Sequence, residues 1–185
     1  EQIYVFENDG AGEFTPRIVY GATNEDFGSS GISLADLDQD GDFDVLYTNG
    51  DAFDYTPSGP RPWHGVQWLE NRGELDFAYH RLADFPGAYS ARAADADQDG
   101  DLDIFVVSMF ADWTDPEAVS IAWLENDGSE AFALRPIDNA PTHLVVLDAG
   151  DLDADGLVDV VTGGMYSHEP IVHLSRVTWW RNTGR

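Results

Sequence analysis

The chain alternates short apolar runs with clusters of polar residues and glycine, a pattern typical of β-strands joined by turns. Runs rich in β-branched residues cover residues 43–48, 102–107 and 157–162. No long segment repeats its apolar positions with the 3.6-residue period of an amphipathic helix. The chain is therefore predicted to be all-β, with a helix content near zero.

The apolar runs belong to a repeated unit, which two independent markers identify. One marker is an acidic loop that starts at Asp36, Asp95 and Asp151, at spacings of 59 and 56 residues. The other is an aromatic strand that ends in Asn-x-Gly, with asparagines spaced by 63, 55 and 56 residues. These asparagines are Asn8, Asn71, Asn126 and Asn182. Two unrelated motifs with nearly the same period indicate a tandem repeat.

Each complete repeat is predicted to hold four antiparallel strands. A short strand precedes the acidic loop, the β-branched strand follows it, and the aromatic strand comes third. A fourth strand follows the Asn-x-Gly turn, because Asn and Gly tolerate positive φ. The first strands are expected at 32–35, 91–94 and 143–147, and the fourth strands at 14–20, 77–82 and 132–137.

Four antiparallel strands in a unit of about 40–55 residues are typical of a β-propeller blade. A β-sandwich is the alternative fold, but it has no reason to repeat one loop three times at one period. The predicted blades cover residues 31–82, 90–137 and 143–184, the last without its fourth strand, and residues 1–20 form a partial blade. We therefore expect about three blades plus a partial one, either open or part of a larger propeller.

Thirteen predicted strands are too few to close a propeller ring. The sequence opens at Glu1 rather than at a methionine, and we expect a processed or excised piece of a longer protein. Unpaired blade edges would otherwise be exposed, so copies of the chain that complete one another are the alternative.

Each acidic loop reads Asp-x-Asp-x-Asp-Gly-x-x-Asp, and this alternation points three carboxylates toward one centre. The glycine permits the sharp bend that wraps the chain round an ion, and the last aspartate closes the shell. The residue after the glycine is expected to offer its backbone carbonyl, because it is Asp42 in one loop and Leu157 in another. The predicted ligands are Asp36, Asp38, Asp40, Asp42 and Asp44; Asp95, Asp97, Asp99, Asp101 and Asp103; and Asp151, Asp153, Asp155, Leu157 and Asp159.

An all-oxygen shell of about six or seven ligands favours Ca²⁺, whereas Mg²⁺ demands stricter octahedral geometry and Zn²⁺ prefers His or Cys. An EF-hand is excluded because its twelfth position is Glu between helices, whereas these loops have Tyr47, Val106 and Thr162 there. A solvated acidic turn without metal is the competing interpretation, and three copies of the loop argue against it. Three calcium sites with a structural role are predicted.

The overall charge agrees with cation binding. Lys and Arg number 9 against 35 Asp and Glu, which gives a net charge of −26. Such a field repels nucleic acid and anionic membranes and attracts cations. Six tryptophans argue against a disordered acidic chain, and no apolar run is long enough to cross a bilayer. Neither nucleic-acid binding nor membrane insertion is expected, and the chain has no cysteine for thiol chemistry.

The acidic loop between short strands, followed by Trp-Leu-Glu-Asn-x-Gly, resembles the FG-GAP/VCBS repeats. The resemblance runs from Tyr4 to Gly184, and the Phe-Gly element is only weakly echoed, at Phe27-Gly28 and at Phe85-Pro86-Gly87. It implies an extracellular or cell-surface propeller of the integrin-α type, used for adhesion or ligand binding, with calcium on the aspartates named above. The chain departs from the family in having too few blades to close.

The loops on the face opposite the acidic loops carry aromatic residues. They are Tyr55, Trp63, His64, Phe110, Trp113, His168 and His173. These side chains could stack on sugar rings, or they could pack between blades. The leading prediction is an extracellular calcium-binding module whose loop face binds a protein or glycan ligand.

Two alternatives remain beside the leading prediction. One is a subunit of a surface layer or filament that assembles with other copies through open blade edges, and the other is a lectin-like glycan binder. An enzyme is not predicted, because no Ser-His-Asp spacing or metal-type His pair is present. The clustered aspartates that could serve a glycosidase are already assigned to calcium.

Overall fold

The computed structural model describes residues 2–169, 173–174 and 176–184. This part of the chain contains thirteen strands and no helix, which confirms the all-β prediction. Accordingly, the described residues include no helix of the length and hydropathy needed to cross a membrane.

The strands form four antiparallel sheets, each built from consecutive strands. The N-terminal hairpin consists of β1 (Gln2–Asn8) and β2 (Phe14–Gly21). The first blade consists of β3 (Gly31–Ala35), β4 (Asp44–Thr48), β5 (Gly65–Asn71) and β6 (Phe77–Asp84). The second blade consists of β7 (Ala88–Ala94), β8 (Asp103–Ser108), β9 (Ile121–Asn126) and β10 (Phe132–Asp138). The third blade consists of β11 (Leu144–Gly150), β12 (Asp159–Gly164) and β13 (Val177–Trp180).

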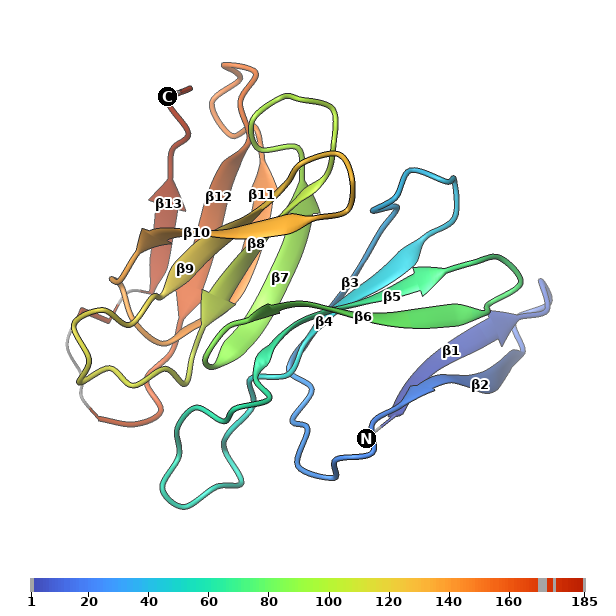
Figure 1. Ribbon diagram of the computed structural model, residues 1–185, viewed down its shortest axis with the longest axis horizontal. Helices are drawn as coiled ribbons and strands as arrows, with labels where there is room; N and C mark the ends of the chain where they lie inside the picture. The colour runs from blue at the N-terminus through green and yellow to red at the C-terminus, as the bar shows by residue number, and fades with distance from the viewer. Residues whose placement is uncertain (1, 170–172, 175, 185) are drawn as a thin grey trace.

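The four sheets lie side by side in chain order, fanned out as propeller blades are, from the N-terminal hairpin to the third blade (Figure 1). The hydrophobic clusters lie between them. Ile3 of the hairpin packs with Tyr47 and Leu69 of the first blade. Trp68 and Leu46 of the first blade share a cluster with Ile104 of the second. A further cluster joins the second and third blades. The core is thus a series of interfaces between blades.

Burial of the second strand follows from this arrangement. Every residue of β4 and β8 is buried, because alternate side chains enter the cores on both sides of the blade. The exposed fraction of the first tryptophan in the aromatic motif depends on whether a neighbouring blade covers it. Trp68 is 1% exposed between two blades, whereas Trp179 of the third blade is 50% exposed. A strand that reads as continuously apolar therefore marks a blade with neighbours on both faces.

Strand boundaries differ from the predicted ones where the backbone departs from regular geometry. The first strand of the second blade starts at Ala88, three residues earlier than expected, with an irregularity between Ala88 and Ser90. His143 lies outside β11 because its φ is 59°, in the left-handed region. The β-branched strand of the third blade begins at Asp159 rather than at residue 157.

Antiparallel pairing separates two kinds of loop. The acidic loops and the Asn-x-Gly turns share one end of the blades, and the longer loops after β4, β8 and β12 share the other. The sequence predicts the third of these longer loops at residues 164–173, of which 170–172 lie outside the described residues.

Candidate metal centres

The three acidic loops close equivalent hairpins. The first loop (36–43) joins β3 to β4, the second (95–102) joins β7 to β8, and the third (151–158) joins β11 to β12. Each follows the same last ladder pair, as Ala35 with Asp44 shows in the first blade. The fourth residue of every loop has a left-handed backbone, with φ of 58° at Gln39, 66° at Gln98 and 61° at Ala154. In the first two loops, this bend and the glycine that follows turn the first three aspartates toward one another.

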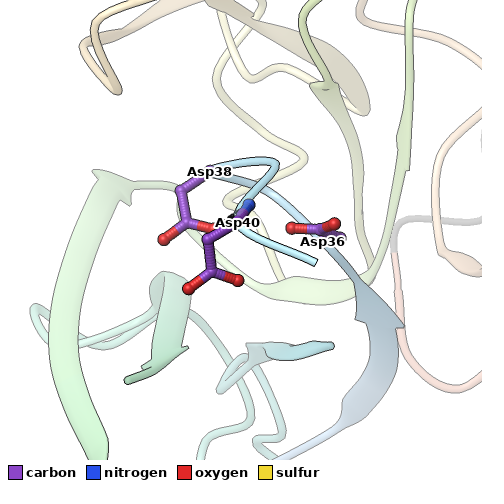
Figure 2. A group of neighbouring side chains, drawn as sticks. All are labelled: Asp36, Asp38 and Asp40. Atoms are coloured by element: carbon purple, nitrogen blue, oxygen red, sulfur yellow. Dashed lines mark hydrogen bonds between the residues drawn. The ribbon is translucent and has the colours of Figure 1, made fainter. Parts of the chain in front are cut away.

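In the first loop the carboxylates of Asp36, Asp38 and Asp40 converge (Figure 2). One oxygen from each lies within 4.8 Å of the others. The backbone fixes them in place, because Gly41 N donates to Asp36 Oδ2 at 3.1 Å and Asp42 N donates to Asp40 Oδ1 at 2.8 Å. The second loop brings Asp95, Asp97 and Asp99 together within the same limit.

The first loop contains a buried carboxylate oxygen that a cation could satisfy. Asp36 Oδ1 is buried and accepts no hydrogen bond from the described residues, an arrangement that is costly for a carboxylate oxygen. A hard cation among these oxygens would satisfy it. The donor set, which is oxygen alone, suits calcium rather than zinc.

The crowding of charge is visible in the pKa values of the central aspartates. Burial raises the pKa of Asp38, and the negative charges of Asp40 and Asp36 raise it further. Burial and the charge of Asp99 likewise raise the pKa of Asp97 in the second loop. A bound cation would relieve this repulsion.

The last aspartate of the loop has a structural task that the sequence pattern did not predict. Asp44 is fully buried. Its Oδ2 accepts from Leu37 N at 2.9 Å and its Oδ1 from Asn71 N at 2.8 Å. Asp103 repeats both bonds with Ala96 N and Asn126 N. This carboxylate therefore ties the acidic loop to the Asn-x-Gly motif, and calcium ligation by Asp44 and Asp103 stays a prediction.

The residue after the loop glycine lies against the Asn-x-Gly turn. In the second blade a Cβ on Gly128 would meet Asp101 Oδ2 at 2.5 Å, and Gly128 has a φ of 78°. The positive φ favours glycine there, and the Asp101 carboxylate would have to shift to admit a side chain. Ligation through the backbone carbonyls of Asp42, Asp101 and Leu157 stays a prediction.

The third loop assembles a different group. One oxygen each from Asp151, Asp153 and Asp159 lie within 4.8 Å of one another, and Asp155 is not among them. Arg181 contacts this loop, with Nε 2.6 Å from Asp153 Oδ2 and a terminal nitrogen 3.3 Å from Asp155 Oδ2. Burial raises the pKa of Asp159, but the hydrogen bond from Asn182 N, other hydrogen bonds and the charge of Arg181 outweigh it, so this pKa is lowered.

Several of the aromatic residues of the opposite loop face pack against other side chains of the molecule. Phe110 is fully buried and stacks on His168 with ring centroids 5.2 Å apart. Trp113 is buried, and its Nε1 donates to Met109 O at 3.1 Å. Trp63 Nε1 and the Tyr55 hydroxyl both donate to Asp26 O. Packing, rather than sugar stacking, therefore accounts for Phe110 and Trp113.

The fold and the loops define a class of protein: an all-β repeat protein with propeller-type blades whose inner hairpins carry aspartate loops. Residues 1–47, which include the first acidic loop, match the family described as FG-GAP-like repeat. The resemblance inferred from the motifs is thereby confirmed over this segment. No curated protein matches the chain.

Proposed function

We propose that this chain is a calcium-binding propeller module in which ions in the acidic loops stabilise the blades. The observation that carries the proposal is the first loop, where three carboxylates converge within 4.8 Å and Asp36 Oδ1 is buried without a hydrogen bond. The second loop repeats the arrangement with Asp95, Asp97 and Asp99. An ion at either position would join the first two strands of a blade.

The expected stabilisation follows from mass action. Weak calcium sites have dissociation constants of about 10⁻⁴–10⁻³ M. In about 1 mM calcium, a site bound only by the native state then contributes about 0.4–1.4 kcal/mol. Calcium also cancels part of the repulsion within a chain whose net charge is −26.

Thermal unfolding in calcium and in EGTA tests the proposal. We expect a lower melting temperature in EGTA, and a smaller calcium effect in Asp38→Asn, because this variant removes one carboxylate from the first loop. Asp54→Asn is the matched control, since Asp54 is exposed in the loop between β4 and β5. Equal melting temperatures in calcium and EGTA for the unaltered chain would contradict calcium binding.

We propose that the module lies outside the cell or at the cell surface. There it would bind a protein or glycan ligand on the loop face opposite calcium. The FG-GAP-like repeat match of residues 1–47 supports an extracellular setting, where millimolar calcium would fill even weak sites. An open cleft of about 310 Å³ on that face is lined by Arg61, Asp112, Trp113 and His168, among others. Its charged and hydrogen-bonding groups suit a polar ligand. Binding assays with Arg61→Ala would test this cleft.

Self-assembly is a second candidate, which the outer faces of the end sheets favour. Phe6 and Phe14 of the N-terminal hairpin are each 59% exposed, and Val177 of β13 is 72% exposed. Apolar side chains at these two ends are suited to contact further blades, from other copies or from elsewhere in a longer chain. Sedimentation equilibrium in calcium distinguishes the two candidates, because a strict monomer at high concentration argues against assembly.

A further inference from the structure

The third acidic loop differs from the other two in its charge. Leu157 stands where the other loops have Asp42 and Asp101, and a second difference arises in the aromatic motif. The position before the motif asparagine is Glu70 in the first blade and Glu125 in the second, but Arg181 in the third. The substitution replaces a negative charge with a positive one at the same place in the repeat.

The two glutamates contact basic residues on the outer strand of their own blade. Glu70 Oε2 lies 2.6 Å from His80 Nε2 of β6, and Glu125 Oε2 lies 2.7 Å from Arg135 Nε of β10. Arg181 instead contacts the acidic loop, at 2.6 Å from Asp153 and 3.3 Å from Asp155. Two of the predicted calcium ligands of the third loop are thus paired with a guanidinium group.

The grouping of the carboxylates also differs in the third loop. The first and second loops group the aspartates at positions one, three and five of the motif. In the third loop, position five is Asp155, which contacts Arg181, and the converging group contains Asp159 in its place. Calcium in the predicted shell of this loop would need Asp155 to move and the guanidinium to leave.

We propose that Arg181 serves as the resident counter-charge of the third loop, so that this loop binds calcium much more weakly than the first two. The inference rests on the proposed calcium function of the first and second loops. Exchange of a glutamate for an arginine beside a divalent ion removes an attraction and adds a repulsion. At a separation of several ångströms in water, the two effects together weaken binding by about tenfold or more.

An exposed ion pair is itself weak, at about 0–1 kcal/mol, and the Arg181 side chain is 55% exposed. Arg181 therefore does not lock the loop as tightly as calcium would. It gives the third blade a hairpin whose negative charge is partly offset at low calcium, while the first and second blades depend on the ion.

Calorimetric titration of the folded chain with calcium chloride tests the inference, with circular dichroism to verify folding of each variant. The unaltered chain should bind calcium at two sites of similar affinity, with a third site at least about tenfold weaker. Asp97→Asn should remove one strong site, whereas Asp153→Asn should leave both. Arg181→Gln should strengthen the third site, and Arg17→Gln, which removes the same charge from the N-terminal hairpin, should not.

The outcomes separate this inference from the proposal on which it rests. Three sites of equal affinity in the unaltered chain, one of which disappears in Asp153→Asn, would overturn the role of Arg181 and leave the calcium function intact. Affinity at the third site that is unchanged by Arg181→Gln would also overturn it. No binding at any loop, in the unaltered chain or in Arg181→Gln, would overturn the calcium function and this inference together.

Discussion

At the residue scale, aspartates of one motif divide into two groups with different surroundings. Asp36, Asp38 and Asp40 crowd their carboxylates together in the loop. Asp44 is fully buried and accepts two backbone hydrogen bonds, which leaves neither of its oxygens without a partner. Burial raises the pKa of Asp44, and the bonds from Asn71 and Leu37 oppose this effect. The central carboxylates are the ones proposed to bind a cation, whereas Asp44 already has two backbone donors.

Asp44→Asn should therefore destabilise the first blade even without calcium. The amide retains one acceptor oxygen but turns an NH₂ group toward a backbone N–H, which leaves a buried donor without a partner. We expect a loss of about 1–3 kcal/mol in the free energy of unfolding, measured by urea denaturation in EGTA. Asp42→Asn, at an exposed side chain in the same loop, should change it little. Equal effects of the two substitutions would contradict the role of Asp44 in tying the acidic loop to the Asn-x-Gly motif.

At the element scale, side chains of one loop reach the next blade. Gln39 Nε2 of the first loop donates to Gly100 O of the second at 2.7 Å. Gln98 Nε2 of the second loop donates to Gly156 O of the third at 2.6 Å. The same position in the third loop is Ala154, which has no side-chain donor. The three acidic hairpins are thus joined in a row, in addition to the apolar contacts between their sheets.

Shortening the glutamine tests this link. Gln39→Asn and Gln98→Asn keep a residue that tolerates the left-handed backbone, but the side chain is one methylene too short to reach the next loop. Each should lower the free energy of unfolding by about 0.5–1.5 kcal/mol. Ala154→Asn is the matched control, because its φ of 61° is similar and it has no inter-loop bond to lose. A loss of stability in Ala154→Asn as large as in Gln39→Asn would show that the backbone, and not the bond, is responsible.

At the scale of the whole molecule, buried histidines should make the fold sensitive to acid. Burial lowers the pKa of His64 to about 4, assisted by the charges of Arg61 and Arg81. Burial and the neighbouring His168 lower the pKa of His143 to about 4. His64 Nδ1 accepts from Gly87 N at 3.2 Å, so the neutral ring links the first blade to the start of the second. Protonation would remove this acceptor.

The sign of the pH effect follows from the lowered pKa values. The folded state disfavours the proton, so the contribution of each histidine is complete above the ordinary pKa of about 6.5 and is lost as the pH falls toward 4. At pH 5 we expect a loss of about 1–2 kcal/mol per histidine relative to pH 7. His64→Asn, which keeps an acceptor near Nδ1, should reduce the slope of stability against pH in EGTA. An unchanged slope would show that His64 does not titrate with unfolding.

Much of this architecture follows from the sequence because its signals are local and repeated. Alternating apolar residues, the turn chemistry of Asn-x-Gly and the period of the two motifs predicted the thirteen strands and their order in antiparallel blades. The same motifs predicted the family resemblance that residues 1–47 confirm. The convergence of Asp36, Asp38 and Asp40 also follows from their alternation within one tight loop.

The tertiary structure alone decided which of these side chains are paired, buried or left without partners. Asp44 on β4 accepts a hydrogen bond from Asn71 on the neighbouring strand β5, and Trp113 is buried beneath the loop face. Arg181 contacts Asp155, which lies 26 positions earlier in the sequence. Backbone periodicity reports where a side chain points relative to its own strand, and this is a local property. Its partners come from segments distant in sequence, and the pairing of strands within a blade, together with the packing of one blade against the next, brings them within reach.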